Sequence, residues 1–116
     1  MKTLKTFFLI LTSYFLLSVL FTLPLITQIT THGFGHDEDS GYQLWHNWWF
    51  KYSIFDLHQS PLTTDYIFHP QKINLIYDAN AFVFSAMTVP FQFLTGNVVL
   101  SSNIIFLFSF ALAGFF

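Results

Sequence analysis

The sequence has no cysteine and no arginine, and its four basic residues are all lysines. Without cysteine, both a disulfide framework and a thiolate metal site are excluded. The net charge of the 116 residues is −2, and the four lysines do not form a basic cluster. Nucleic-acid binding requires a concentrated positive surface. We therefore expect no nucleic-acid partner.

Charge is also missing from two long stretches of the chain. Residues 6–31 and 79–116 carry no Asp, Glu, Lys, Arg or His, whereas all six acids and all five histidines lie between His32 and Asp78. The chain is 53% hydrophobic and includes 17 phenylalanines. This pattern predicts an all-α integral membrane protein with two to three transmembrane helices and a large first extracytoplasmic loop. We expect a multi-pass protein of the cell membrane, with membrane lipid as its first partner.

The first uncharged segment, residues 7–29, is long enough for a transmembrane helix, which needs about 20 apolar residues. Lysines occur before it and not directly after it. The positive-inside rule therefore places residues 1–6 in the cytoplasm and the loop of residues 30–79 outside. A cleaved signal peptide is the alternative, but its apolar region would be unusually long, and residues 27–32 offer no small-x-small cleavage site. Pro24 is expected to kink this helix rather than to end it.

The polar block predicts an amphipathic helix over about residues 40–56, with Asp39 or Ser40 as its N-cap. Its aromatic stripe favours the headgroup layer of the outer membrane surface; the stripe contains Trp45, Trp48, Trp49, Tyr52 and Phe55. Packing of the stripe on neighbouring protein is the alternative. If the aromatic stripe lies on the membrane surface, the polar side chains lie on the helix face away from the lipid. These side chains are Asp39, Gln43, His46 and Asn47. After this helix we expect an irregular loop with short extended pieces at 65–70 and 74–78.

The second uncharged block is 38 residues long, enough for two short helices that meet at Gly96-Asn97. Residues 80–95 contain Pro90 and are predicted to form a short transmembrane or re-entrant helix. Residues 97–116 are predicted to form a transmembrane helix. The apolar run stops at the last residue without a polar tail. We therefore expect the chain to be a truncated, N-terminal part of a longer protein.

Several motifs follow one another in an order that resembles a known family. They are Asp39-x-x-x-Gln43-x-Trp45-x-x-Trp48-Trp49, Ser60-Pro61-x-x-Thr64-Asp65-Tyr66-Ile67-Phe68-x-Pro70-Gln71, Asn74-Leu75, Pro90, Gly96, Asn103 and Ala113-Gly114. This order is similar to the N-terminal part of bacterial and archaeal membrane proteins of the GT-C glycosyltransferase superfamily. That group includes the dolichyl-phosphate-mannose protein mannosyltransferases and many uncharacterised relatives. The chain departs from the usual pattern at Lys72, which follows Pro70-Gln71.

The resemblance implies transfer of a sugar from a polyprenyl-phosphate donor to an acceptor on the outer face of the membrane. It implies that Asp39 or Asp37 acts as the base that deprotonates the acceptor, which is a role for a carboxylate within hydrogen-bond reach. Substrate-binding residues would be Gln43, His46 and Asn47, together with Asp65 in a matched motif.

Other interpretations of the polar block stay open. The acids from Asp37 to Asp39 also fit a solvated loop at the positive end of a helix dipole. His32 and His36, with Asp37, are candidate ligands for a divalent metal ion, although the two glycines between the histidines disfavour a helical spacing. The alternative function is a non-catalytic small membrane protein, or a truncated product, whose acidic and aromatic outer loop binds a partner or a metal ion. That alternative is favoured if the 116 residues are the whole product, because no phosphate-binding half is present.

Overall fold

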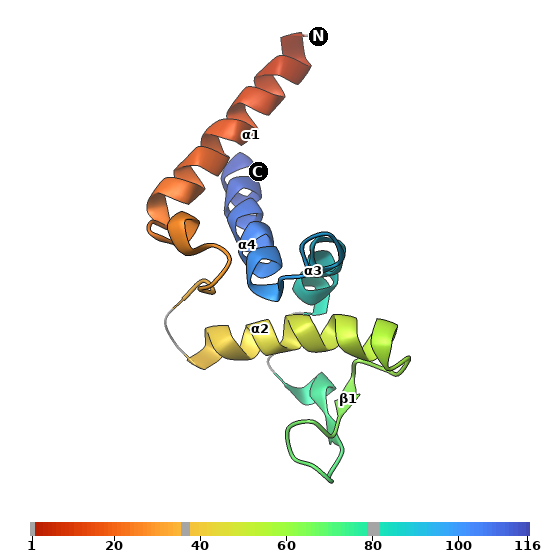
Figure 1. Ribbon diagram of the computed structural model, residues 1–116. Coiled ribbons are helices and arrows are strands. Elements are labelled where there is room, and N and C mark those ends of the chain that lie inside the picture. The colour runs from red at the N-terminus through yellow and green to blue at the C-terminus, as the bar shows by residue number, and fades with distance from the viewer. Residues whose placement is uncertain (1, 36–37, 79–81) are drawn as a thin grey trace.

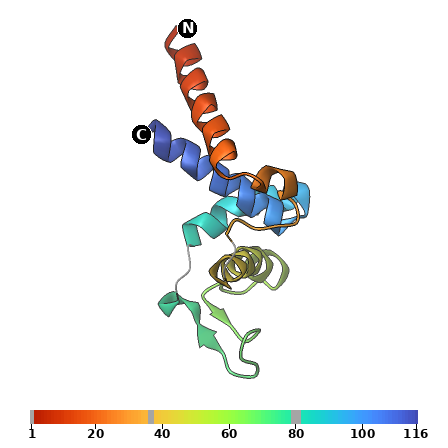
Figure 2. The ribbon, with the colours of Figure 1, turned by 90° about the vertical axis from the view of Figure 1, so that its left-hand side faces the viewer.

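The computed structural model describes residues 2–35, 38–78 and 82–116, and these residues are mostly helical. Two helices are long and apolar enough to cross a membrane by length and composition, α1 (Lys2–Phe21) and α4 (Val98–Phe115). Figure 1 shows α1 and α4 together at one end of the molecule, α2 (Glu38–Lys51) running across below them, and the strand pair beyond α2. Figure 2 shows the same order, with α3 (Phe82–Thr95) between α4 and α2.

Helix α1 ends earlier than the sequence predicts. The prediction was a helix to residue 29 with a kink at Pro24, but α1 stops at Phe21 and a short 3₁₀ helix, η1 (Leu25–Gln28), follows. Pro24 has no N–H to donate to the carbonyl of Leu20, and it disfavours helical backbone in the residue before it. Proline therefore ends this helix.

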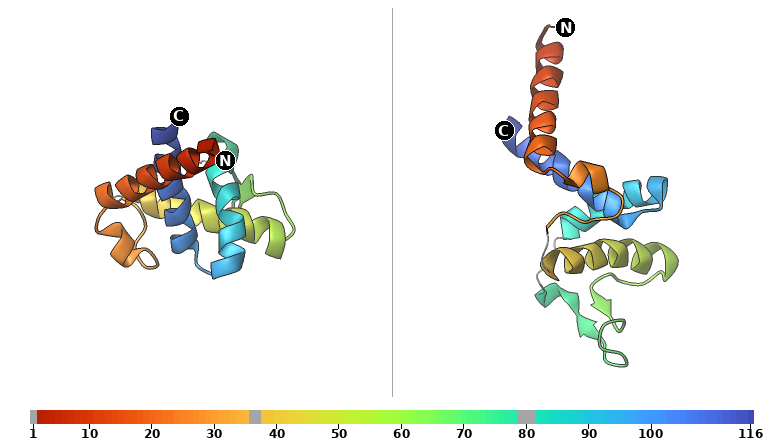
Figure 3. Two further views of the ribbon diagram at one scale, coloured as in Figure 1. Left: turned by 90° about the horizontal axis from the view of Figure 1, so that it is seen from above. Right: turned by 60° about the vertical axis from the view of Figure 1, so that its left-hand side comes forward.

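Helices α1 and α4 pack against each other in opposite directions. The ring of Phe7 lies 4.9 Å from that of Phe115 between centroids, and Phe15 lies 5.4 Å from Phe108. The start of α1 is thus beside the end of α4, and both views of Figure 3 show the two chain ends on the same side of the molecule. If both helices span a membrane, this pairing puts both ends on one side of it.

Helix α3 is shorter than a membrane span. Its 14 residues rise about 21 Å, against about 30 Å for the hydrocarbon core of a bilayer. It ends as the sequence predicts, because Gly96 adopts a positive φ of 65° and its N–H donates to the carbonyl of Gln92. Asn97 then caps α4 by accepting a hydrogen bond from the N–H of Leu100 at 3.0 Å.

The polar block of the sequence forms helix α2 and the loop that follows it. Asp39 and Ser40 lie within the first turn of α2 rather than at its N-cap, and a π-helical turn, η2 (Tyr52–Asp56), continues α2. The loop carries two short antiparallel strands, β1 (Thr63–Thr64) and β2 (Ile73–Asn74), in which Thr64 pairs with Ile73. The expected extended piece at 74–78 is wrong, because η3 (Leu75–Tyr77) is a 3₁₀ turn capped by the Asn74 side chain.

Candidate functional site

The polar face of α2 packs onto α3 and α4, and Asn47 is its centre. The Asn47 amide donates to the Ser102 hydroxyl of α4 at 2.8 Å and accepts from the Ser85 hydroxyl of α3 at 2.8 Å. It also accepts from Gln43 at 3.0 Å, and its backbone carbonyl accepts from Gln92 at 2.9 Å. The Asn47 side chain is fully buried. Gln43 and Asn47 therefore hold three helices together instead of lining an open site.

The predicted polar face of α2 is the face that packs on α3 and α4. Of the two interpretations of the aromatic stripe, the headgroup layer and packing on neighbouring protein, the second holds for Trp49, which is buried. In the structure the indole of Trp49 faces the loop, where Nε1 donates to the carbonyl of Pro61 at 3.1 Å and the ring lies 5.1 Å from Tyr66. The polar face packs there because α3 and α4 carry buried polar groups of their own; these are Ser85, Thr88, Gln92, Ser101, Ser102 and Asn103. Asn47 satisfies three of them, Ser85 and Ser102 through its side chain and Gln92 through its backbone carbonyl.

A second polar cluster lies where the loop returns toward α3. Tyr42 and His46, one turn apart on α2, both face Asp78. The Tyr42 hydroxyl donates to Oδ2 of Asp78, and Nε2 of His46 lies 3.5 Å from the same oxygen. Burial, and then the bond to Asp78, raises the pKa of Tyr42 to about 12. Burial lowers the pKa of His46, and the nearby Asp78 carboxylate partly opposes that shift.

The predicted base, Asp39, is solvent-exposed in the first turn of α2 beside the equally exposed Glu38. It lies on the same side of the helix as His46, seven residues further along. The second candidate base, Asp37, lies outside the described residues. The structure therefore presents Asp39 to water, while it buries His46 and Asn47 behind it.

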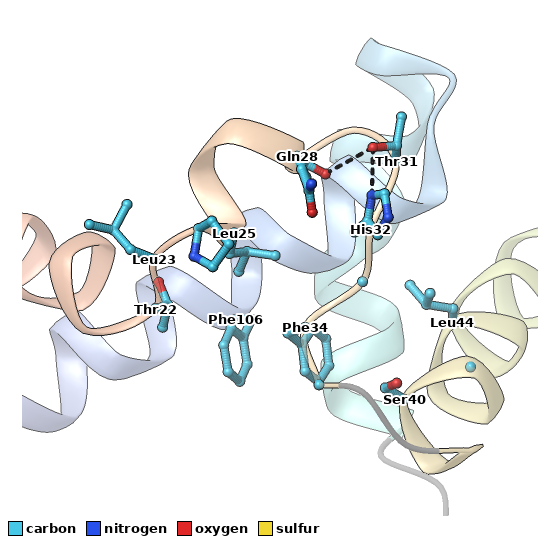
Figure 4. Close-up of a pocket in the computed structure, with 14 residues that line it drawn as sticks. Thr22, Leu23, Leu25, Gln28, Thr31, His32, Phe34, Ser40, Leu44 and Phe106 are labelled. Carbon is cyan, nitrogen blue, oxygen red and sulfur yellow. Dashed lines mark hydrogen bonds between the residues drawn. The ribbon is translucent and has the colours of Figure 1, made fainter.

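A cavity of about 530 Å³ lies beside the C-terminal end of α1. Figure 4 shows its wall formed by the turn after α1, by the segment leading to α2, by the start of α2 and by Phe106 of α4. Most of the wall is apolar, with polar groups at Thr22, Gln28, Thr31, His32 and Ser40. Ser40 and Gly41 line it but Asp39 does not, so the carboxylate lies next to the cavity rather than inside it. This size is in the usual range for small-molecule sites, about 300–1,000 Å³.

Asn103 holds the segment that forms this wall. Its amide donates to the carbonyls of Ile29 and His32 at 2.8 Å each and accepts from the N–H of Phe34 at 3.0 Å. A fully buried asparagine from α4 thus positions the chain between α1 and α2. The sequence shows Asn103 as one polar residue in an apolar run and does not reveal this role.

Of the three predicted metal ligands, only His32 lies within the described residues. The exposed His32 shares a hydrogen bond with the Thr31 hydroxyl at 2.9 Å, while His36 and Asp37 lie outside the described residues. Across residues 2–35, 38–78 and 82–116, no group of three or more His, Asp or Glu residues is arranged to hold a metal ion.

Asp65 lies apart from the other predicted binding residues. Its carboxylate is 3.8 Å from the ring of His69, and the adjoining Tyr66 packs on Trp49 in the second half of α2. Asp39 is at the opposite end of that helix. In contrast, Tyr42 and Asp78 belong to the polar cluster, although the sequence places them in the predicted amphipathic helix and in the expected extended piece at 74–78. Their spacing of 36 residues leaves no local pattern to detect.

Comparisons of the chain with protein-family models, with curated proteins and with solved structures found no match.

Proposed function

We propose that this chain acts in a membrane glycosyltransferase that transfers a sugar from a polyprenyl-phosphate donor to an acceptor on the outer face of the membrane. The observation that carries the proposal is the position of Asp39. An exposed carboxylate in the first turn of α2 adjoins a largely apolar cavity at the end of a helix that is long enough to span a bilayer. A carboxylate in this position could lie within hydrogen-bond reach of an acceptor hydroxyl while the donor's lipid portion occupies the apolar cavity.

Membrane insertion is part of the proposal. Helices α1 and α4 are the two described helices that are long and apolar enough to cross a bilayer. Lys2 and Lys5 are at the start of α1, so the positive-inside rule favours a cytoplasmic N-terminus. The end of α1, the cavity and α2 would then lie at the outer surface.

The chemistry assigns separate roles to the carboxylate and the cavity. Asp39 would accept the proton of the acceptor hydroxyl as its oxygen bonds to the anomeric carbon, while the sugar–phosphate bond breaks and polyprenyl phosphate leaves. The apolar wall, which includes Leu25, Phe34, Leu44 and Phe106, would take the first isoprene units of the donor. Binding the lipid portion would place the sugar-phosphate bond near the start of α2.

The test uses the adjoining acids as a matched set. Asp39→Asn should abolish sugar transfer from a radiolabelled polyprenyl-phosphate sugar, in the membrane protein as it occurs naturally, while membrane insertion is unchanged. Glu38→Gln removes an equally exposed carboxylate of the same turn and should retain activity. Asp37→Asn tests the other candidate base. Full activity in both Asp39→Asn and Asp37→Asn would refute the proposal.

A second candidate function is binding of a protein partner without catalysis. It is favoured by large apolar side chains on the loop beyond α2, where Tyr77 is 90% and Phe68 is 62% exposed. Such exposure is typical of interaction surfaces when several residues adjoin. In this case Phe68→Ala and Tyr77→Ala should weaken co-purification of a partner, and Asp39→Asn should have no effect on it.

A further inference from the structure

A second cavity lies between α3 and α4, and its wall is almost entirely apolar. Its volume is about 340 Å³, and we call it the α3–α4 groove. Among the described residues that line it, Ser109 alone has a polar side chain, and its hydroxyl donates to the carbonyl of Phe106 at 2.7 Å. The groove therefore offers a ligand apolar contacts and no free hydrogen-bonding side chain. The other lining residues are Val83, Phe84, Met87, Ile105, Phe108 and Leu112.

The groove follows α4 along its axis. Ile105, Phe108 and Leu112 recur at helical spacing, so they form one stripe that covers about 10 Å at about 1.5 Å per residue. The end of α4 packs beside the start of α1, where Phe115 contacts Phe7. With the proposed cytoplasmic N-terminus, the groove runs from the outer surface into the bilayer. This course suits an elongated apolar chain.

The ring of Phe34 borders both this groove and the cavity beside the end of α1. Phe34 and Phe106 line that cavity, and their rings stack with centroids 4.2 Å apart, as Figure 4 shows. Phe34 also contacts Phe84 of the α3–α4 groove, at 6.0 Å between centroids. The N–H of Phe34 donates to the buried side chain of Asn103 at 3.0 Å, which fixes the position of this residue. An apolar chain that leaves the cavity past Phe34 therefore meets the groove next.

We propose that the α3–α4 groove holds the isoprenoid chain of the donor beyond the units bound in the cavity, and that the chain passes from one to the other at Phe34. This inference rests on the proposed function. Lipid tails are as apolar as the groove, so burial alone gives the chain little preference for it. The preference comes from van der Waals contacts with a wall of matching shape. Continuity with the cavity favours the donor's chain over a phospholipid acyl chain of the same chemistry.

The test is photo-crosslinking of the membrane protein, as it occurs naturally, in phosphatidylcholine nanodiscs. Undecaprenyl phosphate carries a diazirine either in the isoprene unit next to the phosphate or in a unit further along the chain. The first probe should label peptides of the cavity wall. The second should label the peptides that contain Met87 and Phe108, which line the groove. Mass spectrometry of the crosslinked peptides identifies the labelled residues.

Two variants fill the groove without disturbing the fold. Met87→Trp and Val83→Trp each place an indole in it, and the native side chains are 48% and 76% exposed. Each variant should lose labelling of the groove by the second probe, because the indole occupies the space, while the first probe labels the cavity wall as before. The matched control is Leu94→Trp, at a residue of α3 that is 82% exposed and does not line the groove. It should keep both labels.

The outcomes separate this inference from the proposed function. If the first probe does not label the cavity wall, the proposed function loses its donor site and the inference falls with it. If the first probe labels the cavity but the second labels no groove residue, only the inference is overturned. The same conclusion follows if Met87→Trp and Val83→Trp are labelled like the native chain.

A third probe identifies the source of the chain in the groove. Phosphatidylcholine with a diazirine in its acyl chain should lose its labelling of groove residues when unlabelled undecaprenyl phosphate is added. Labelling that does not change would assign the groove to phospholipid and overturn the inference.

Discussion

Helix α4 makes two contacts of opposite character. Toward α1 it presents aromatic rings and Gly114. The hydroxyls of Thr12, Ser13 and Ser18 in α1 bond to the backbone of their own helix, as Ser13 does to Leu9 at 2.8 Å. Toward α2 and α3, α4 presents Ser102, which bonds across the helix boundary to Asn47. The first contact depends on shape and the second on hydrogen bonds, so different substitutions should break each one.

The largest effect is expected from Asn47→Leu, which keeps the volume of the side chain but removes its donor and acceptor. Ser85 and Gln43 would lose an acceptor inside a buried interface. We expect a loss of about 2–4 kcal/mol in the free energy of unfolding. Denaturant titration in detergent measures it, and a loss below about 0.5 kcal/mol would show that the network does not hold these helices together.

The next largest loss in the free energy of unfolding is expected from a substitution at the contact of α4 with α1. A Cβ atom added at Gly114 would lie 2.5 Å from Cδ1 of Tyr14, closer than real Cβ contacts allow. Gly114→Val should therefore separate the helix ends and cost about 1–3 kcal/mol. Adding Tyr14→Ala makes room for the new side chain and should recover part of the loss. A double variant no more stable than Gly114→Val would contradict a contact limited by shape.

A pH effect should distinguish the two regions, because α1 and α4 contain no histidine. Burial lowers the pKa of His46, so the unfolded chain binds the proton more readily than the folded chain. The contribution of neutral His46 to the free energy of unfolding is therefore full above about pH 6.5, the ordinary histidine pKa. It decreases as the pH falls below that value. His46→Gln should flatten this dependence in thermal unfolding measured from pH 7.5 to 5.5. The exposed His58→Gln is the control, and an unchanged slope in His46→Gln would exclude this cause.

The smallest effect is expected from Ser13→Ala. The Ser13 hydroxyl bonds only within its helix and is solvent-exposed. The change should alter the free energy of unfolding by less than about 0.5 kcal/mol in the same denaturant titration used for Asn47→Leu. A loss near that of Asn47→Leu would mean that α1 also depends on polar contacts.

Much of the helix content could be predicted from the sequence, since α2, α3 and α4 lie close to the ranges that hydropathy and periodicity indicate. The end of α1 was predicted wrongly because the apolar run continues past Pro24 although the backbone hydrogen bonds do not. The polar face of α2 was predicted, but its burial against α3 and α4 was not. Periodicity identifies residues that share a face, such as Gln43 and Asn47, but it does not identify what that face contacts.

The uncharged segments, their length for crossing a membrane and the place of Asp39 at the start of a helix could all be predicted from the order of residues. The burial of Asn47 among hydroxyl groups, the bonds of Asn103 to the segment beside the cavity and the contact of Asp78 with Tyr42 and His46 became visible only in the folded chain. This division arises because hydropathy and helix formation depend on near neighbours in the chain. The polar contacts instead join residues 32 to 74 positions apart, and each needs a partner from another element to satisfy its buried group.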